Sequence, residues 1–236
     1  MPAPYPLPLD WKPVPSPGPV TLRGRAVTLE PLDAERHTAD LWRAVQGHDE
    51  VWTWLSDGPY ASEAALGRSL STKQAAMDAV FLAIVPAETG NAVPPRAGLG
   101  PPGAYAAGYA SFMRIERAHG VIEVGNILLA PSLQRTTAAT EAMFLMASHI
   151  FGLGYRRYEW KCNALNQPSR RAALRLGFTF EGIFRQHMVI KGQSRDTAWF
   201  SMLDSEWPAR KRAFEAWLEP ANFDDEGRQR QSLVSF

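Results

Sequence analysis

The stretch from Ile122 to Met143, IEVGNILLAPSLQRTTAATEAM, constrains the fold more than any other part of the chain. An apolar segment of strand character runs into a proline turn, and polar residues then lead into a segment whose apolar residues recur at helical spacing. The start of a helix exposes unpaired backbone N–H groups and carries about half a positive charge. The order of strand, turn and helix therefore predicts a place where a phosphate group can bind to the backbone.

The rest of the chain predicts a mixed α/β sheet with helices on its faces, because strand-like and helical segments alternate without an internal repeat. Asp33 stands where the side chain that caps a helix belongs. Helices are expected at 34–45, 49–55, 62–77, 137–152, 168–176 and 208–218. Strands are expected at 27–32, 79–85, 104–115, 121–129, 155–162, 186–191 and 197–203.

The 236 residues fit one domain, which we expect to span 20–207. Residues 1–19 hold too many prolines for a helix or a central strand, so they predict an extended arm. Residues 208–236 read as a last helix followed by a polar tail. The segment from Pro86 to Gly103 reads as a long loop that either covers the site or stays disordered. Four apolar side chains could dock the arm on the domain: Tyr5, Leu7, Leu9 and Trp11.

Composition excludes several classes of function. The chain has 25 basic and 24 acidic residues, so no overall field attracts nucleic acid or anionic lipid. No apolar run approaches the roughly 20 residues of a membrane-spanning helix. The five histidines lack ligand spacing, so we expect no metal. The single cysteine cannot form an internal disulfide, which agrees with the cytoplasmic location that we expect.

The turn after the central strand resembles that of the GNAT superfamily of N-acetyltransferases, whose pattern is Gln/Arg-x-x-Gly-x-Gly/Ala. Gln134 and Ala139 fit this pattern, whereas Thr137 replaces the usual glycine. The stretches LGYRRYEWKCNALNQPSRRAALRLGFTFEGIFRQH and DTAWFSMLDSEWP are similar to the subgroup that modifies ribosomal-protein N-termini. The resemblance spans about 20–208 and implies the GNAT fold, an α+β architecture. In that fold a twisted, mostly antiparallel sheet has helices on both faces and a splay between two central parallel strands.

The resemblance implies that acetyl-CoA is the co-substrate, that a primary amine is the acceptor, and that the protein is a monomer or a homodimer. The residues that would bind acetyl-CoA are Ile127, Leu128, Leu129, Gln134, Arg135, Thr136, Thr137, Ala138, Ala139, Thr140, Asn166, Ser169 and Arg170. Thr136 and Thr137 would also serve simply to cap a core helix. A β-branched residue resists positive φ, so Thr137 fits the turn only if its backbone is already helical.

The resemblance also assigns the chemistry. An amine attacks only in its neutral form, and Glu123, on the central strand, is the candidate base. Many GNAT enzymes have a tyrosine acid where this chain has Ala173, so Ser169 is the substitute candidate for protonating the leaving thiolate. The alternatives are that Glu123 is a solvated carboxylate paired with an arginine and that Ser169 only begins a helix.

The segment VWTWLSDGPY resembles the part of this subgroup that walls the acceptor side, which implies that Trp52, Trp54 and Tyr60 bind the acceptor, although such aromatics also serve as core. Whether the acceptor is a protein N-terminus or a small-molecule amine stays open. Two other classes of function also remain. One is an acyl-CoA-binding or sensing protein without turnover, suggested by Thr137, and the other is a protein-interaction module, suggested by the arm and eight tryptophans.

Overall fold

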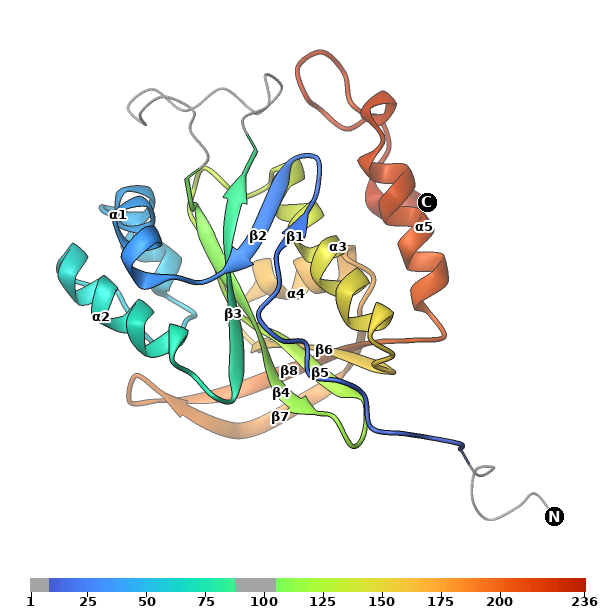
Figure 1. Cartoon of the computed structure of the whole chain (residues 1–236), viewed down its shortest axis with the longest axis horizontal. Coiled ribbons are helices and arrows are strands. Elements are labelled where there is room, and N and C mark those ends of the chain that lie inside the picture. The colour runs from blue at the N-terminus through green and yellow to red at the C-terminus, as the bar shows by residue number, and fades with distance from the viewer. Residues whose placement is uncertain (1–8, 88–104) are drawn as a thin grey trace.

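The computed structural model describes residues 9–87 and 105–236. Its strands form one eight-stranded sheet in the order β1-β2-β3-β4-β5-β6-β8-β7 (Figure 1). Neighbouring strands are antiparallel, except that β5 and β6 are parallel. The strands are β1 Leu22–Arg23, β2 Val27–Pro31, β3 Ala79–Pro86, β4 Gly108–Glu116, β5 Val121–Leu129, β6 Arg157–Asn163, β7 Thr179–Ile190 and β8 Gln193–Leu203.

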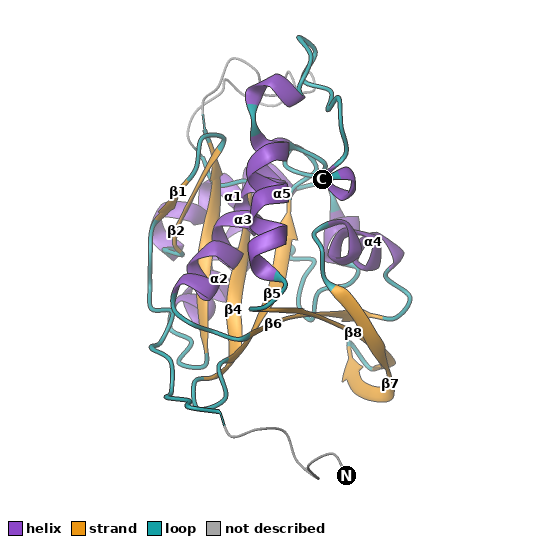
Figure 2. Cartoon of the chain, turned by 90° about the vertical axis from the view of Figure 1, so that its right-hand side faces the viewer, coloured by secondary structure: helices purple, strands orange, loops and turns teal. Residues whose placement is uncertain are grey.

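The helices cover both faces of this sheet. α1 and α2 pack together on one face, and α3 and α5 cover the other (Figures 1 and 2). The α-helices are α1 Ala34–Val45, α2 Glu63–Gln74, α3 Thr137–Gly152, α4 Gln167–Arg175 and α5 Trp207–Leu218. The short 3-10 turns are η1 Asp49–Trp52, η2 Pro220–Asn222 and η3 Leu233–Ser235. Among the described residues, no helix combines the length and the apolar character that a membrane span requires.

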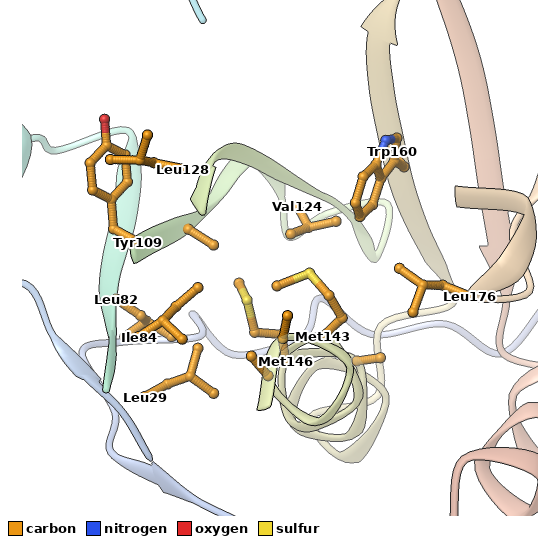
Figure 3. Close-up of a cluster of buried hydrophobic side chains, with 14 of the residues drawn as sticks. Leu29, Leu82, Ile84, Tyr109, Val124, Leu128, Met143, Met146, Trp160 and Leu176 are labelled. Carbon is orange, nitrogen blue, oxygen red and sulfur yellow. The ribbon is translucent and has the colours of Figure 1, made fainter. Parts of the chain in front are cut away.

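The main core lies between the sheet and α3. Met143 and Met146 on α3 point toward Leu29, Ile84 and Val124 on the strands (Figure 3). These side chains are buried, so they supply much of the apolar area that drives this layer together. On its outer side α3 packs against α5, where the ring of Phe151 stacks on that of Trp207 at 5.0 Å between centroids.

The sheet parts at its only parallel pair within the described residues. β5 and β6 are paired from Val121 with Arg157 to Val124 with Trp160, and beyond that point they separate. Figure 2 shows β6, β8 and β7 turned away from the plane of β1 to β5. The expected mixed, mostly antiparallel sheet with a splay between two parallel strands is therefore confirmed.

The observed helices agree with the positions predicted from the sequence better than the observed strands do. Asp33, Ser62 and Thr136 each cap a helix, because their side chains accept a hydrogen bond from an N–H of the first turn. The helix expected at 49–55 is only the 3-10 turn η1. The strand expected at 186–191 is wrong in its start, since β7 begins at Thr179, and the strand expected from Ala104 begins at Gly108. Most of the expected loop at 86–103 lies outside the described residues.

Part of the N-terminal arm is seen along the domain. The indole N–H of Trp11 donates to the carbonyl of Ala118 at 2.7 Å, and the ring lies under the guanidinium of Arg156. Farther along, the hydroxyl of Tyr155 donates to the carbonyl of Pro15. Leu9 remains largely exposed, while the expected docking of Tyr5 and Leu7 concerns residues outside the described ranges.

Candidate active site

The turn before α3 is built around Thr136. Its hydroxyl donates to the carbonyl of Leu133 at 2.7 Å and accepts from the N–H of Ala139 at 3.1 Å. Arg135 takes the left-handed conformation, with φ of 62°, and thereby turns the chain into the helix. Thr137 is the first helical residue. Its backbone is therefore helical, which is the condition under which a β-branched residue fits this turn.

Four consecutive backbone N–H groups in this turn, those of residues 135–138, have no hydrogen-bond partner among the described residues. They lie at the positive end of α3, so an anion placed there gains both hydrogen bonds and a favourable field. The side-chain amide of Gln134 donates to the carbonyl of Leu129 at 3.0 Å and fastens the turn to the end of β5. We call residues 135–138 the α3 cradle.

β5 leads from the parting of the sheet to the α3 cradle, but it is interrupted by a bulge. Gly125 pairs with Ser111 and Leu128 pairs with Tyr109, so two residues of β5 face one residue of β4. Asn126 has φ of 51°, and its side-chain amide donates to the hydroxyl of Ser111 at 2.9 Å. The residues after Val124 have no pairing with β6, so Ile127 to Leu129 form a backbone edge at the parting. The turn-prone pair Gly-Asn was the available signal for this bulge.

The start of α4 holds the next two predicted residues. The Oδ1 atom of Asn166 accepts from the N–H of Ser169 at 3.1 Å, so Asn166 caps the helix and keeps its side-chain N–H groups available. The hydroxyl of Ser169 accepts from the indole N–H of Trp160 at 3.0 Å. Arg170 donates to the carbonyl of Ala164, and Ala173 is completely buried.

Glu123 lies in β5 on the face opposite Val124, because successive side chains of a strand alternate. It is only 4% exposed, so it is buried rather than solvated. Its Oε2 atom lies 2.5 Å from Nζ of Lys161 and 3.6 Å from Nε of Arg114. Burial raises the pKa of Glu123, and the positive charges of Lys161 and Arg114 oppose that rise.

Lys161 is a site residue that the sequence analysis missed. It projects from β6 with its side chain 8% exposed, and its ammonium lies 4.4 Å from the centroid of the Trp199 ring. Burial lowers the pKa of Lys161, while Glu123 acts in the opposite direction. The only signal in the sequence was a lysine between two residues that are usually buried, Trp160 and Cys162, in an expected strand.

The predicted aromatic wall is divided between core and surface. Trp52 is buried and meets Tyr60 edge to face at 5.1 Å between centroids. The hydroxyl of Tyr60 donates to Oδ2 of Asp57 at 2.6 Å, whereas Trp54 is exposed. Lys191, in the turn between β7 and β8, donates to the carbonyl of Trp52 at 2.9 Å. The aromatic segment and the β7–β8 hairpin therefore touch, although they are far apart in the sequence.

These features form one elongated site. A strand rises about 3.3 Å per residue, so the six steps from Glu123 to Leu129 span roughly 20 Å before the chain turns into the α3 cradle. An extended ligand with an anionic group at one end could bind the cradle and place its other end near the parting of β5 and β6. The residues present can thus bind an anion, pair with an extended chain and accept a proton at a buried carboxylate.

Comparison with known proteins is consistent with this arrangement. The sequence matches the family model of the acetyltransferase (GNAT) domain over residues 26–179. It is similar to the crystal structure of a GCN5-related N-acetyltransferase from Brucella melitensis, with 46% identity, coverage of 96% of this chain and 97% of that chain, and a TM-score of 0.88.

Two further solved structures extend the comparison. A probable acetyltransferase of the GNAT family from Chromobacterium violaceum is 38% identical, covers 88% of this chain and 98% of its own, and has a TM-score of 0.76. A ribosomal L7/L12 alpha-N-protein acetyltransferase shares the fold at 20% identity, with coverage of 78% and 94% and a TM-score of 0.61. No significant match was found among curated proteins.

Proposed function

Because this chain belongs to the GNAT family of acetyltransferases, we propose that it transfers an acetyl group from acetyl-CoA to a primary amine. The amine attacks the thioester directly, in a ternary complex of protein, acetyl-CoA and acceptor. One observation carries the proposal: β5 connects a cradle of four free backbone N–H groups to a buried carboxylate at the parting of the sheet.

In this proposal the N–H groups of the α3 cradle bind the pyrophosphate of acetyl-CoA. Ile127 to Leu129 offer backbone groups to the amides of the pantetheine arm, since β6 does not pair with them. The free side-chain N–H groups of Asn166 suit a carbonyl of the same arm. Four further side chains lie along the starts of the two helices and are assigned to the same ligand: Gln134, Ala139, Thr140 and Arg170.

The chemical step needs a base, because an amine carries a proton at neutral pH and attacks only without it. Glu123 accepts that proton as the nitrogen bonds to the acetyl carbon. The bond between carbon and sulfur then breaks, and Ser169 supplies a proton to the departing thiolate. The hydroxyl of Ser169 accepts from the indole N–H of Trp160, so its own hydrogen is directed elsewhere, toward the thiol of Cys162 or the departing thiolate.

The acceptor enters beside the segment that contains Trp52, Trp54 and Tyr60. The exposed ring of Trp54 is free to contact a ligand, whereas Trp52 and Tyr60 hold the segment in shape by packing against each other. The exposed ring can attract a cationic amine before it loses its proton. A protein that only senses acyl-CoA has no need of a buried base here, so the burial of Glu123 favours the enzyme.

The proposal is tested by incubating the protein with acetyl-CoA and a panel of primary amines and measuring acetylated product by mass spectrometry. We expect Glu123→Gln to lower kcat/KM about 10²- to 10⁴-fold, because the amide cannot take a proton, and to retain acetyl-CoA binding. Glu116→Gln, an exposed glutamate on the neighbouring strand, is the matched control and should match the wild type. Full activity of Glu123→Gln would remove the assigned base, and acetyl-CoA binding without any product would favour the sensing protein.

A further inference from the structure

Two buried donors on one face of β8 lack an acceptor. The Nε atom of Arg195 and the Nε1 atom of Trp199 are buried without a hydrogen-bond partner among the described residues. The alternation of side chains along a strand places Arg195, Thr197 and Trp199 on the same face of β8. Buried N–H groups are rarely left unpaired, so this pair points to oxygen atoms that arrive with a ligand.

The same face continues into the candidate active site. β8 pairs with β6 so that Trp199 stands opposite Lys161, whose ammonium contacts the Trp199 ring and the carboxylate of Glu123. The guanidinium of Arg114 also lies over the Trp199 ring, at 5.6 Å from its centroid. The face of β8 that carries the orphan donors therefore begins beside the proposed base.

Positive charge on this face exceeds what the local carboxylates balance. Lys161 and Arg114 share the single carboxylate of Glu123, and Arg195 has no carboxylate within ion-pair distance in the described parts of the chain. The nearest other acid on β6, Glu159, is held by Arg157 at 2.8 Å.

Arg195 also acts electrostatically on the buried Cys162 of β6, whose pKa is raised by burial, so that its thiol stays uncharged. The other titratable group on this face is His187 of β7, whose ring contacts Thr197 and Trp199. Its pKa is lowered by burial and by the neighbouring positive charges of Lys161, Arg195 and Arg114. The imidazole is therefore mostly neutral at neutral pH and adds no charge of its own. Three cations, Lys161, Arg114 and Arg195, therefore share the single carboxylate of Glu123, which leaves uncompensated positive charge on this face.

We infer that the acceptor carries an acid group besides its amine, and that Arg195 binds this group on the face of β8 next to the base. The inference rests on the proposed function and narrows the substrate class of that function to amines that also carry a carboxylate. The four steps from Trp199 to Arg195 span roughly 13 Å, so the acid group lies several bonds from the amine. A free amino acid derivative and a peptide N-terminus with an early acidic residue share this chemistry.

The phosphates of acetyl-CoA are also anions that Arg195 could bind, but the proposed function places them at the α3 cradle, far from Arg195. The α3 cradle follows the end of β5, whereas the hairpin of β7 and β8 lies on the opposite side of the molecule from the start of α3 (Figure 1). Arg195 is thus separated from the cradle by the parting of the sheet. This separation predicts that Arg195 acts on the KM of the acceptor and not on that of acetyl-CoA.

The test compares matched acceptors that differ only in the acid group. One arm uses peptides with glutamate or glutamine at their second position, and the other uses ω-amino acids, whose acid lies several bonds from the amine, and their amides. We expect the acidic member of a pair to have a kcat/KM about tenfold higher or more in at least one arm, as for a charge-assisted hydrogen bond. The arm that shows the preference identifies the source of the acid group.

Variants localise the effect. Arg195→Gln should abolish the preference through the KM of the acceptor, and Arg212→Gln, an exposed arginine on α5, should keep it. Equal rates for acid and amide in both arms of the wild type would overturn the inference while leaving the acetyltransferase intact. An Arg195→Gln variant that loses affinity only for acetyl-CoA would also overturn it.

If no amine is acetylated, the same pairs of acid and amide are titrated by calorimetry into the protein saturated with acetyl-CoA, and their dissociation constants are compared. Tighter binding of the acid than of its amide, lost in Arg195→Gln, would support the inference without turnover. Equal binding of both would overturn it. A protein that fails to bind acetyl-CoA at all would instead overturn the proposed function.

Discussion

Glu123 and Lys161 meet just where the two parallel strands separate. Glu123 stands opposite Glu159 in the register, and Lys161 is two residues farther along the same face of β6. Burial favours the neutral form of each side chain, while the ion pair between them favours the charged forms. Lys161 therefore sets the pH range over which Glu123 is ionised and able to accept a proton.

Replacing Lys161 by methionine should raise the pKa of Glu123, because the nearest positive charge is lost while Arg114 and Glu159 remain. A base works when it is ionised, so the acidic limb of the pH profile of kcat/KM should move to higher pH, by on the order of one unit. The control is Lys211→Met, which removes an exposed lysine of α5. A limb that stays in place or moves to lower pH would contradict this role of Lys161.

Single residues were predictable only where a family pattern names them. Glu123 could be proposed from the resemblance of its strand, but its environment could not. Lys161 contacts it from another strand, and neither residue alone reveals that both lie on one face at the parting. Arg195 is still harder to identify, because an unpaired donor is defined by the absence of partners in space.

At the start of α3 the turn forms without the glycine that the GNAT pattern usually has at the position of Thr137. Arg135 supplies the left-handed turn, Thr136 is extended with φ of −98° and ψ of 162°, and Thr137 opens the helix. The N–H groups of residues 135–138 remain free because the hydroxyl of Thr136 accepts from the N–H of Ala139, which lies farther into the helix. The cradle is therefore a property of the backbone, and Thr137 need not be glycine.

This backbone role is testable with proline. Proline is tolerated at the first position of a helix, and the extended Thr136 can precede it, so Thr137→Pro should fold while removing one N–H from the cradle. We expect its dissociation constant for acetyl-CoA to rise about tenfold, the cost of a hydrogen bond to a charged group. Thr137→Ala keeps the N–H and should bind nearly like the wild type. Equal affinities of the proline and alanine variants would contradict the cradle.

The sequence predicts helices better than strands for a physical reason. Helices are marked by local signals, such as the capping residues Asp33 and Ser62, which act within one turn. β7 is an edge strand whose pairing with β8 shifts twice, near Gly182 and Gln186, so its side chains do not keep a strict alternation. The prediction at 186–191 therefore recovered only the regular end of β7.

At the scale of the molecule, the site depends on two blocks of sheet that share only four paired positions, from Val121 with Arg157 to Val124 with Trp160. One block ends at the α3 cradle and the other holds Lys161 and the β7–β8 hairpin. Trp11 of the arm is fixed to the domain next to this joint, at Ala118 and Arg156. Neither of these contact residues is assigned to acetyl-CoA, so we expect the cradle to form without Trp11.

The most direct test is a calorimetric titration of the whole chain with acetyl-CoA, with ATP as a control for general phosphate binding. The account predicts one site per chain with a dissociation constant in the micromolar range or tighter, unchanged in Trp11→Ala. It predicts much weaker binding of ATP, which cannot pair with the edge of β5. No binding of acetyl-CoA, or equal binding of ATP, would contradict the claim that β5 and the α3 cradle form an acetyl-CoA site.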